Sequence, residues 1–256
     1  MIMRFLTAVL LGAFMTLASA QSGKATIVLV HGAFAESASW NRVIAELLAG
    51  GYPVVAAANP LRGIKSDADY VASIVKGIKG PVVLVGHSYG GAVITNVSAG
   101  NVKALVFVSA FAPDQGEALG ELGGRFPGST LGAALAAPVV LPDGGKDLYI
   151  QQDKYASQFA ADVPAKEGRI GAVTQRPIVE AAFGEPSGAP AWKALPSWHI
   201  YGDADKAIAP AAMKFMAERA GSKETVVLKG ASHVTMVSQP KAVAAIIKHA
   251  AAWGQS

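Results

Sequence analysis

The chain has 256 residues, a formal net charge of +4 and no cysteine. Without cysteine, disulfides, thiolate metal sites and a cysteine nucleophile are excluded, so the fold must rest on its hydrophobic core. The positive charge is small and spread along the chain, which gives no support to nucleic-acid binding.

The first 20 residues have the pattern of a secretory signal peptide. Arg4 precedes an apolar stretch from Phe5 to Leu17, and Ala18-Ser19-Ala20 offers a cleavage site. A membrane anchor is the alternative, but about 20 apolar residues are needed to span a bilayer and this stretch is shorter. We therefore predict an exported protein, periplasmic or secreted, with no stable membrane span after cleavage. Residues 21–256 are then the mature chain.

Six apolar runs rich in β-branched residues predict the strands of a sheet. Their nearly continuous apolar character is typical of parallel strands that are buried on both faces, and helical stretches separate them. The pattern predicts one α/β domain with a mostly parallel six-stranded sheet flanked by helices. The runs are Ala25 to Val30, Pro53 to Ala57, Val82 to Val85, Ala104 to Val108, Trp198 to Tyr201 and Thr225 to Leu228.

Between the fourth and fifth runs, the region from Pro113 to Leu195 has no convincing strand and holds eight of the 14 prolines. We interpret residues 113–195 as an inserted, mainly helical cap with one helix predicted from Asp147 to Ala161. In the core, Ser66 is a suitable N-cap for a helix from Asp67 to Lys79. A final helix is predicted from Lys241 to Trp253.

The third run ends in Gly86-His87-Ser88-Tyr89-Gly90, a G-x-S-x-G pattern between a strand and a helix. Such a turn holds the serine in a strained conformation with its hydroxyl exposed, and the flanking glycines avoid clashes where the chain reverses. A glycine-rich junction without a catalytic role would have the same sequence. The rest of the chain must therefore supply a base, an acid and an oxyanion site for Ser88.

Histidine is the usual base for a serine nucleophile, and elimination favours His233. His31 ends the first strand, His87 adjoins Ser88 in the turn, His199 lies in an apolar strand, and His249 falls inside the last helix. His233 directly follows the last strand, where its loop reaches the carboxyl edge of the sheet. Catalytic groups of open α/β sheets gather at that edge.

The acid should follow the fifth strand, where Asp203 and Asp205 compete. We choose Asp205, because Asp203 is better placed to shape the turn after Gly202 by bonding its own backbone. The order Ser88, Asp205, His233 is an order in which parallel α/β sheets carry a catalytic triad.

The oxyanion hole is predicted to combine the backbone N–H of Tyr89 with that of Ala33 in the loop after the first strand. We predict a substrate pocket lined by Phe34, Phe111 and Met236, together with Tyr89, although each of these residues suits a core position equally well. No cofactor and no metal site is predicted.

The chain resembles the α/β-hydrolase superfamily, in particular the branch of plant methyl esterases, hydroxynitrile lyases and bacterial carboxylesterases. The resemblance covers nearly the whole mature chain and rests on VLVHGAF, GHSYGG, ALVFVSAFAP, GDADKAIAP and ASHVTMVSQP. It implies a serine hydrolase that acts on small esters. Hydroxynitrile lyases carry a threonine where this chain has Gly32 and a lysine where it has Val234, so lyase activity is disfavoured.

Two further hypotheses stay open. The same triad also serves a thioesterase or a peracid-forming perhydrolase. A binding or receptor-like protein with slow turnover is the alternative from another class. The expected partner in every case is a small molecule, and the sequence carries no signature of the oligomeric state.

Overall fold

The computed structural model describes residues 23–254, so the predicted signal peptide lies outside the described residues. One six-stranded sheet forms the centre of the fold, and every pair of neighbours in it is parallel. The strand order is β2-β1-β3-β4-β8-β9. These strands are β1 (Thr26–Val30), β2 (Val54–Ala57), β3 (Val82–His87), β4 (Val102–Val108), β8 (Ser197–Gly202) and β9 (Glu224–Leu228).

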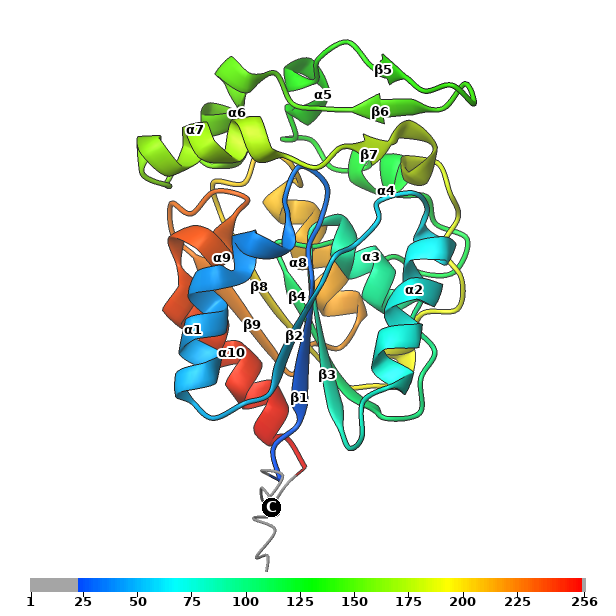
Figure 1. Ribbon diagram of the computed structural model, residues 1–256, viewed down its shortest axis with the longest axis vertical. Helices are drawn as coiled ribbons and strands as arrows, with labels where there is room; N and C mark the ends of the chain where they lie inside the picture. The colour runs from blue at the N-terminus through cyan, green and yellow to red at the C-terminus, as the bar shows by residue number, and fades with distance from the viewer. Residues whose placement is uncertain (1–22, 255–256) are drawn as a thin grey trace, which may run out of the picture.

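All six predicted strands are confirmed, with bounds that differ by one or two residues. Helices cover both faces of the sheet (Figure 1), which explains why the strands are apolar without alternation; every residue of β3, for example, is buried. One face carries α1 (Asn41–Ala49) and α10 (Pro240–Ala252), and the other carries α2 (Ile64–Lys76), α3 (Tyr89–Thr95) and α8 (Pro210–Arg219).

The start of α2 differs from the prediction. The helix begins at Ile64 and not at Asp67, and Ser66 is not its N-cap. The carboxylate of Glu185, more than 100 residues away in the sequence, accepts hydrogen bonds from the backbone N–H groups of Ile64 and Lys65 at 2.6 and 3.0 Å. A remote acid thus takes the place of a local cap, which no local sequence pattern reveals.

The segment between β4 and β8 lies over the carboxyl ends of the sheet (Figure 1). It holds four short helices, two 3-10 turns and a small antiparallel sheet of order β5-β6-β7. No helix among residues 23–254 has the length and apolar character that crossing a membrane requires. The elements of this cap are α4 (Leu119–Gly124), α5 (Leu131–Ala134), β5 (Val139–Val140), β6 (Lys146–Leu148), α6 (Gln152–Phe159), α7 (Ala165–Thr174), β7 (Ile178–Val179), η2 (Glu180–Phe183) and η3 (Ala191–Lys193).

Two expectations for the cap were wrong. The cap does contain strands, and the helix predicted from Asp147 to Ala161 is shorter, because Asp147 belongs to β6 and α6 begins at Gln152. Strands of two or three residues are too short to show an alternating pattern. Tyr155 and Phe159 are both buried on α6, as that prediction required.

His199 is a core histidine, as its position in an apolar strand indicated. Its ring stacks on Phe107 with 4.6 Å between centroids, and Nδ1 lies 3.1 Å from the Ser222 hydroxyl. Burial lowers the pKa of His199 to about 3. The folded protein therefore keeps this ring neutral at acidities where the unfolded chain binds a proton.

We expect acid to destabilise the protein through His199. Well above pH 6.5 the ring is neutral in both the folded and the unfolded state, so it causes no loss. Between pH 6.5 and about 3 only the unfolded state binds the proton, and the free energy of unfolding falls, by about 2 kcal/mol at pH 5. Urea unfolding at pH 7.5 and 5.0 measures this loss, and His199→Phe, which retains a ring for stacking, should lose about 2 kcal/mol less. An equal loss in both proteins would contradict the assignment.

Candidate active site

Ser88 lies at the sharp turn between β3 and α3, with φ 54° and ψ −123°. A positive φ is a strained conformation for a non-glycine residue, and it is the backbone geometry expected of the G-x-S-x-G turn. A Cβ on Gly86 would lie 2.5 Å from the carbonyl oxygen of Gly90, so the turn has no room for a side chain there. Ser88 lines a cavity of about 530 Å³ beneath the cap.

His233 lines the same cavity and forms a buried pair with Asp205. Its Nδ1–H donates to Oδ2 of Asp205 at 2.6 Å, while Oδ1 of Asp205 accepts from the backbone N–H groups of Ala207 and Ile208 at 2.7 and 3.0 Å. Nε2 of His233 has no hydrogen-bond partner among residues 23–254. With the proton on Nδ1, Nε2 is left as the acceptor that a general base requires.

Asp203 has a different hydrogen-bond partner from Asp205. Its Oδ1 accepts a hydrogen bond from the backbone N–H of Gly230 at 2.6 Å. The carboxylate therefore ties the loop after β8 to the loop after β9, rather than bonding its own turn as the sequence suggested. Of the two acids that competed, the structure brings Asp205 to the histidine.

The loop after β1 is in close contact with the Ser88 turn. A Cβ on Gly32 would lie 2.6 Å from Cβ of Ser88 and 3.1 Å from the backbone nitrogen of Tyr89. Ala33 and Tyr89 both line the cavity beside Ser88. The N–H of Phe34, in contrast, donates to the carbonyl of Arg176 at 2.9 Å. The backbone N–H of Phe34 therefore already has an acceptor, and the N–H of Ala33 stays the predicted oxyanion donor from this loop.

Two side chains hold the β1 loop from beneath. His31 is fully buried, and its Nδ1–H donates to the carbonyl of Gly32 at 2.9 Å. Asn59, which follows β2, donates to the carbonyl of His31 at 2.9 Å. Burial lowers the pKa of His31, which keeps the ring neutral in this role. Asn59 was not found by sequence reasoning, and its place directly after a strand end was the only signal.

His87 supports the backbone of His233. Its Nε2–H donates to the carbonyl oxygen of His233 at 3.2 Å, and the two rings lie 4.8 Å apart between centroids. Burial lowers the pKa of His87 well below its ordinary value, and the neighbouring His233 acts in the same direction. His249, in contrast, is exposed on α10 and pairs with Glu224.

Tyr89 is buried, and its hydroxyl makes a polar contact that the sequence did not reveal. Its hydroxyl donates to Oδ2 of Asp67 at 2.9 Å, and both oxygens of Asp67 accept from the backbone N–H of Arg62. Burial raises the pKa of Asp67, and burial together with the Asp67 carboxylate raises that of Tyr89. The residue after Ser88 is thereby fixed to the start of α2.

The cavity around Ser88 is lined almost entirely by apolar side chains. Phe34 and Phe111 line it, as predicted, whereas Met236, which is fully buried in α9 (Thr235–Ser238), does not. Most of the remaining lining comes from the cap. Its members include Leu119, Phe126, Leu131, Leu135, Leu148 and Phe183.

A cap residue also holds the loop of His233. Asp162 Oδ1 accepts from both the hydroxyl and the backbone N–H of Ser232, the residue before His233. Sequence reasoning did not find Asp162, because its partner lies 70 residues further along the chain. The cap therefore fixes the position of His233 as well as covering Ser88.

We expect Gly32→Ala to damage the site directly. The added Cβ would lie 2.6 Å from Ser88 Cβ and 2.7 Å from the carbonyl oxygen of His87, so the loop must move and carry the N–H of Ala33 with it. A misplaced oxyanion donor typically costs about 10²- to 10³-fold in kcat. Steady-state rates on a short ester measure the loss; unchanged kcat would place the oxyanion donor elsewhere.

A family comparison matches most of the chain. The alpha/beta hydrolase family matches residues 27–246. A curated relative, the carbendazim hydrolyzing esterase of Nocardioides sp. (strain SG-4G), is 32% identical over 110 residues, which is 37% of this chain and 46% of that protein. The match thus spans less than half the length of this relative.

Similar solved structures cover almost the whole domain. Polyneuridine aldehyde esterase superposes with a TM-score of 0.75 at 18% identity, over 88% of this chain and 98% of that chain. A pyrethroid hydrolase from Sphingobium faniae JZ-2 has a TM-score of 0.71 at 21% identity, over 90% and 98%. A methylesterase from Arabidopsis has a TM-score of 0.71 at 16% identity, over 88% and 98%. The TM-scores establish a shared fold, and at identities this low the similarity shows the fold alone.

Proposed function

The chain belongs to the alpha/beta hydrolase family, and on this premise we propose that it is a serine hydrolase that cleaves small, largely apolar carboxylic esters. The observation that carries the proposal is the buried His233–Asp205 pair, whose free Nε2 shares a cavity with the strained Ser88. The names of the relatives agree with ester hydrolysis, since they are esterases and a pyrethroid hydrolase.

In the first half of the reaction, the Ser88 hydroxyl attacks the ester carbonyl and gives its proton to Nε2 of His233. Asp205 stabilises the imidazolium through Nδ1–H and holds the tautomer. The N–H groups of Ala33 and Tyr89 bind the oxyanion of the tetrahedral intermediate. When that intermediate collapses, His233 protonates the departing alcohol and Ser88 retains the acyl group.

Water completes the cycle. His233 takes a proton from the water molecule as it attacks the acyl-enzyme, and the second tetrahedral intermediate uses the same two N–H donors. Its collapse returns the proton to the Ser88 oxygen and releases the carboxylic acid. Atoms and charge balance with ester and water alone, so this mechanism requires no cofactor.

The lining of the cavity supports an uncharged substrate. Among the described residues, that lining contains no Asp, Glu, Lys or Arg. Burying a charged group there without a partner would cost several kcal/mol. A cavity of about 530 Å³ suits a small or medium-sized ester.

A thioesterase or a peracid-forming enzyme uses the same triad, so only substrate tests separate them. A hydroxynitrile lyase is disfavoured, because the threonine and the lysine that the resemblance implies for such enzymes are replaced here by Gly32 and Val234. A receptor-like protein with slow turnover would keep the fold and lack rapid hydrolysis.

Initial rates on p-nitrophenyl esters of increasing acyl length, beside thioester analogues of the same acyl groups, test the proposal. Rapid hydrolysis of short and medium esters is the expected result, because these fit the cavity. Preference for thioesters would assign the second enzyme hypothesis. Absence of turnover on every ester, from protein that unfolds cooperatively, would overturn the proposed activity and favour the receptor-like alternative.

A further inference from the structure

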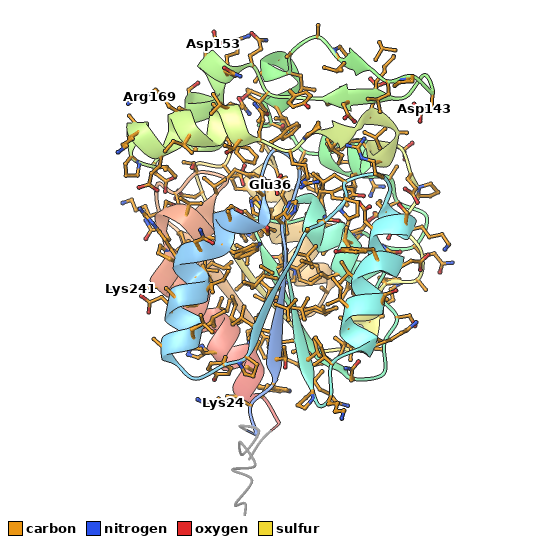
Figure 2. All side chains as sticks on the ribbon, viewed as in Figure 1. Lys24, Glu36, Asp143, Asp153, Arg169 and Lys241 are labelled. Atoms are coloured by element: carbon orange, nitrogen blue, oxygen red, sulfur yellow. The ribbon has the colours of Figure 1, made fainter. Side chains whose placement is uncertain are left out.

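A second cavity lies next to the one that contains Ser88. Its volume is about 390 Å³, against about 530 Å³ for the first. It extends between α7 of the cap and the start of α1, and Glu36, which lines it, lies where the cap meets the core (Figure 2). Val234, directly after His233, is also part of its lining. Ester hydrolysis as proposed above makes no use of this space.

Phe34 is the one residue, within the part of the chain that the structure describes, that lines both cavities. Its side chain is buried and packs edge to face on Phe159, with 6.0 Å between centroids. Phe159 lines the first cavity, and its ring lies 5.2 Å from that of Tyr155, which lines the second. These three rings, each from a residue that lines one or both cavities, form an aromatic partition.

The backbone of Phe34 is held in a strained position by the cap. Its φ is 59°, which is uncommon for a bulky residue and persists only where the surroundings enforce it. Its N–H donates to the carbonyl of Arg176 at 2.9 Å, and its carbonyl accepts from the Tyr155 hydroxyl at 3.0 Å. Both partners belong to the cap, so the cap fixes the ring in the partition.

The second cavity suits an uncharged chain. Its charged lining residues are already paired, since Arg42 bonds Glu167 at 2.6 Å and Glu36 bonds Arg176 at 2.8 Å. The apolar part of its lining, which includes Ala160, Val163, Val234 and Val237, lies beside Phe34 and Tyr155 in the same cavity. A hydrocarbon chain that entered from the Ser88 side would meet these side chains and no unpaired ion.

We propose that Phe34 determines the maximum length of the ester. Its ring separates the Ser88 cavity from the second cavity, which would otherwise serve as a subsite for an apolar chain. This inference rests on the proposed function, because it assigns the size limit of that same site. Removing the ring joins the two cavities. Esters whose acyl or alcohol chain is too long for the first cavity then gain a place for their far end.

Phe34→Ala tests the proposal with two ester series. One is p-nitrophenyl butyrate, octanoate and decanoate, and the other is butyl, octyl and decyl acetate, followed by acid release. In at least one of these two series, the ratio of kcat/KM for the longest ester to that for the shortest should be at least tenfold higher than in the wild-type protein. Such a rise is about the gain from burying two further methylene groups. Phe34→Leu should give a smaller rise, and it replaces the alanine variant if that protein does not fold.

Two further variants separate this effect from general loosening. Phe111→Ala is the matched control, since Phe111 lines only the first cavity; it should raise the ratio by much less. Val163→Trp fills the second cavity with a larger side chain, and in combination with Phe34→Ala it should cancel the gain.

An unchanged ratio in Phe34→Ala with butyrate hydrolysis retained would overturn the inference, as would a gain that Val163→Trp leaves intact. If the wild-type protein hydrolyses no ester, the proposed function fails and this inference with it. The wild-type rate on butyrate distinguishes the two failures.

Discussion

Ser88→Ala is expected to lower kcat for ester hydrolysis by about 10⁵- to 10⁶-fold, since the proposed nucleophile disappears while the cavity and the oxyanion donors stay. The alanine loses only a hydroxyl, so the fold and the binding of an ester should be preserved. Initial rates on p-nitrophenyl butyrate, from protein free of the wild-type enzyme, measure the loss.

Ser109→Ala is the matched control for that experiment. Ser109 is also buried, also has a positive φ, and follows β4, the strand next to β3, but its hydroxyl bonds Thr235 and lies outside the cavity lining. We expect it to keep most of the activity. His233→Ala should resemble Ser88→Ala, and the double variant should lose little more, because the two residues act in one step. Activity that survived Ser88→Ala would show that another group performs the attack.

Asp205→Asn is expected to lower kcat by about 10⁴-fold, which corresponds to about 5.5 kcal/mol of transition-state stabilisation. The amide can still accept from the N–H groups of Ala207 and Ile208, so the loop should keep its shape. Its NH₂ group, however, would face Nδ1 of His233 and favour the tautomer with the proton on Nε2. That histidine can no longer accept the serine proton, and its imidazolium loses a counter-charge.

Asp203→Asn separates the two acids that the sequence left in competition. Asp203 bonds the backbone N–H of Gly230, and an asparagine oxygen can do the same. We therefore expect a small change in kcat for Asp203→Asn beside the large one for Asp205→Asn, measured on the same ester. The reverse result would move the acid of the triad to Asp203 and require a rearranged loop after β8.

Local pattern was sufficient for the core of the fold. The six parallel strands were predicted to within one or two residues, because buried strands and the turns that follow them have strong local signatures. The cap was harder, since Val139–Val140 is too short to show a pattern, and Ile178–Val179 forms only by pairing with the distant Asp147 and Leu148. The start of α2 was missed for the same reason, as its capping acid, Glu185, comes from elsewhere.

By itself, the sequence determined which strand end each candidate residue follows. It therefore also determined that Ser88, the Asp203–Asp205 turn and His233 gather at one edge of a parallel sheet. Only the tertiary structure decided which carboxylate meets His233, that Met236 is core, and that Phe34 separates two cavities. The physical reason is that the order of strand ends follows from local hydrophobic pattern. Side-chain partners depend on distances of a few ångströms between segments that are far apart in the chain.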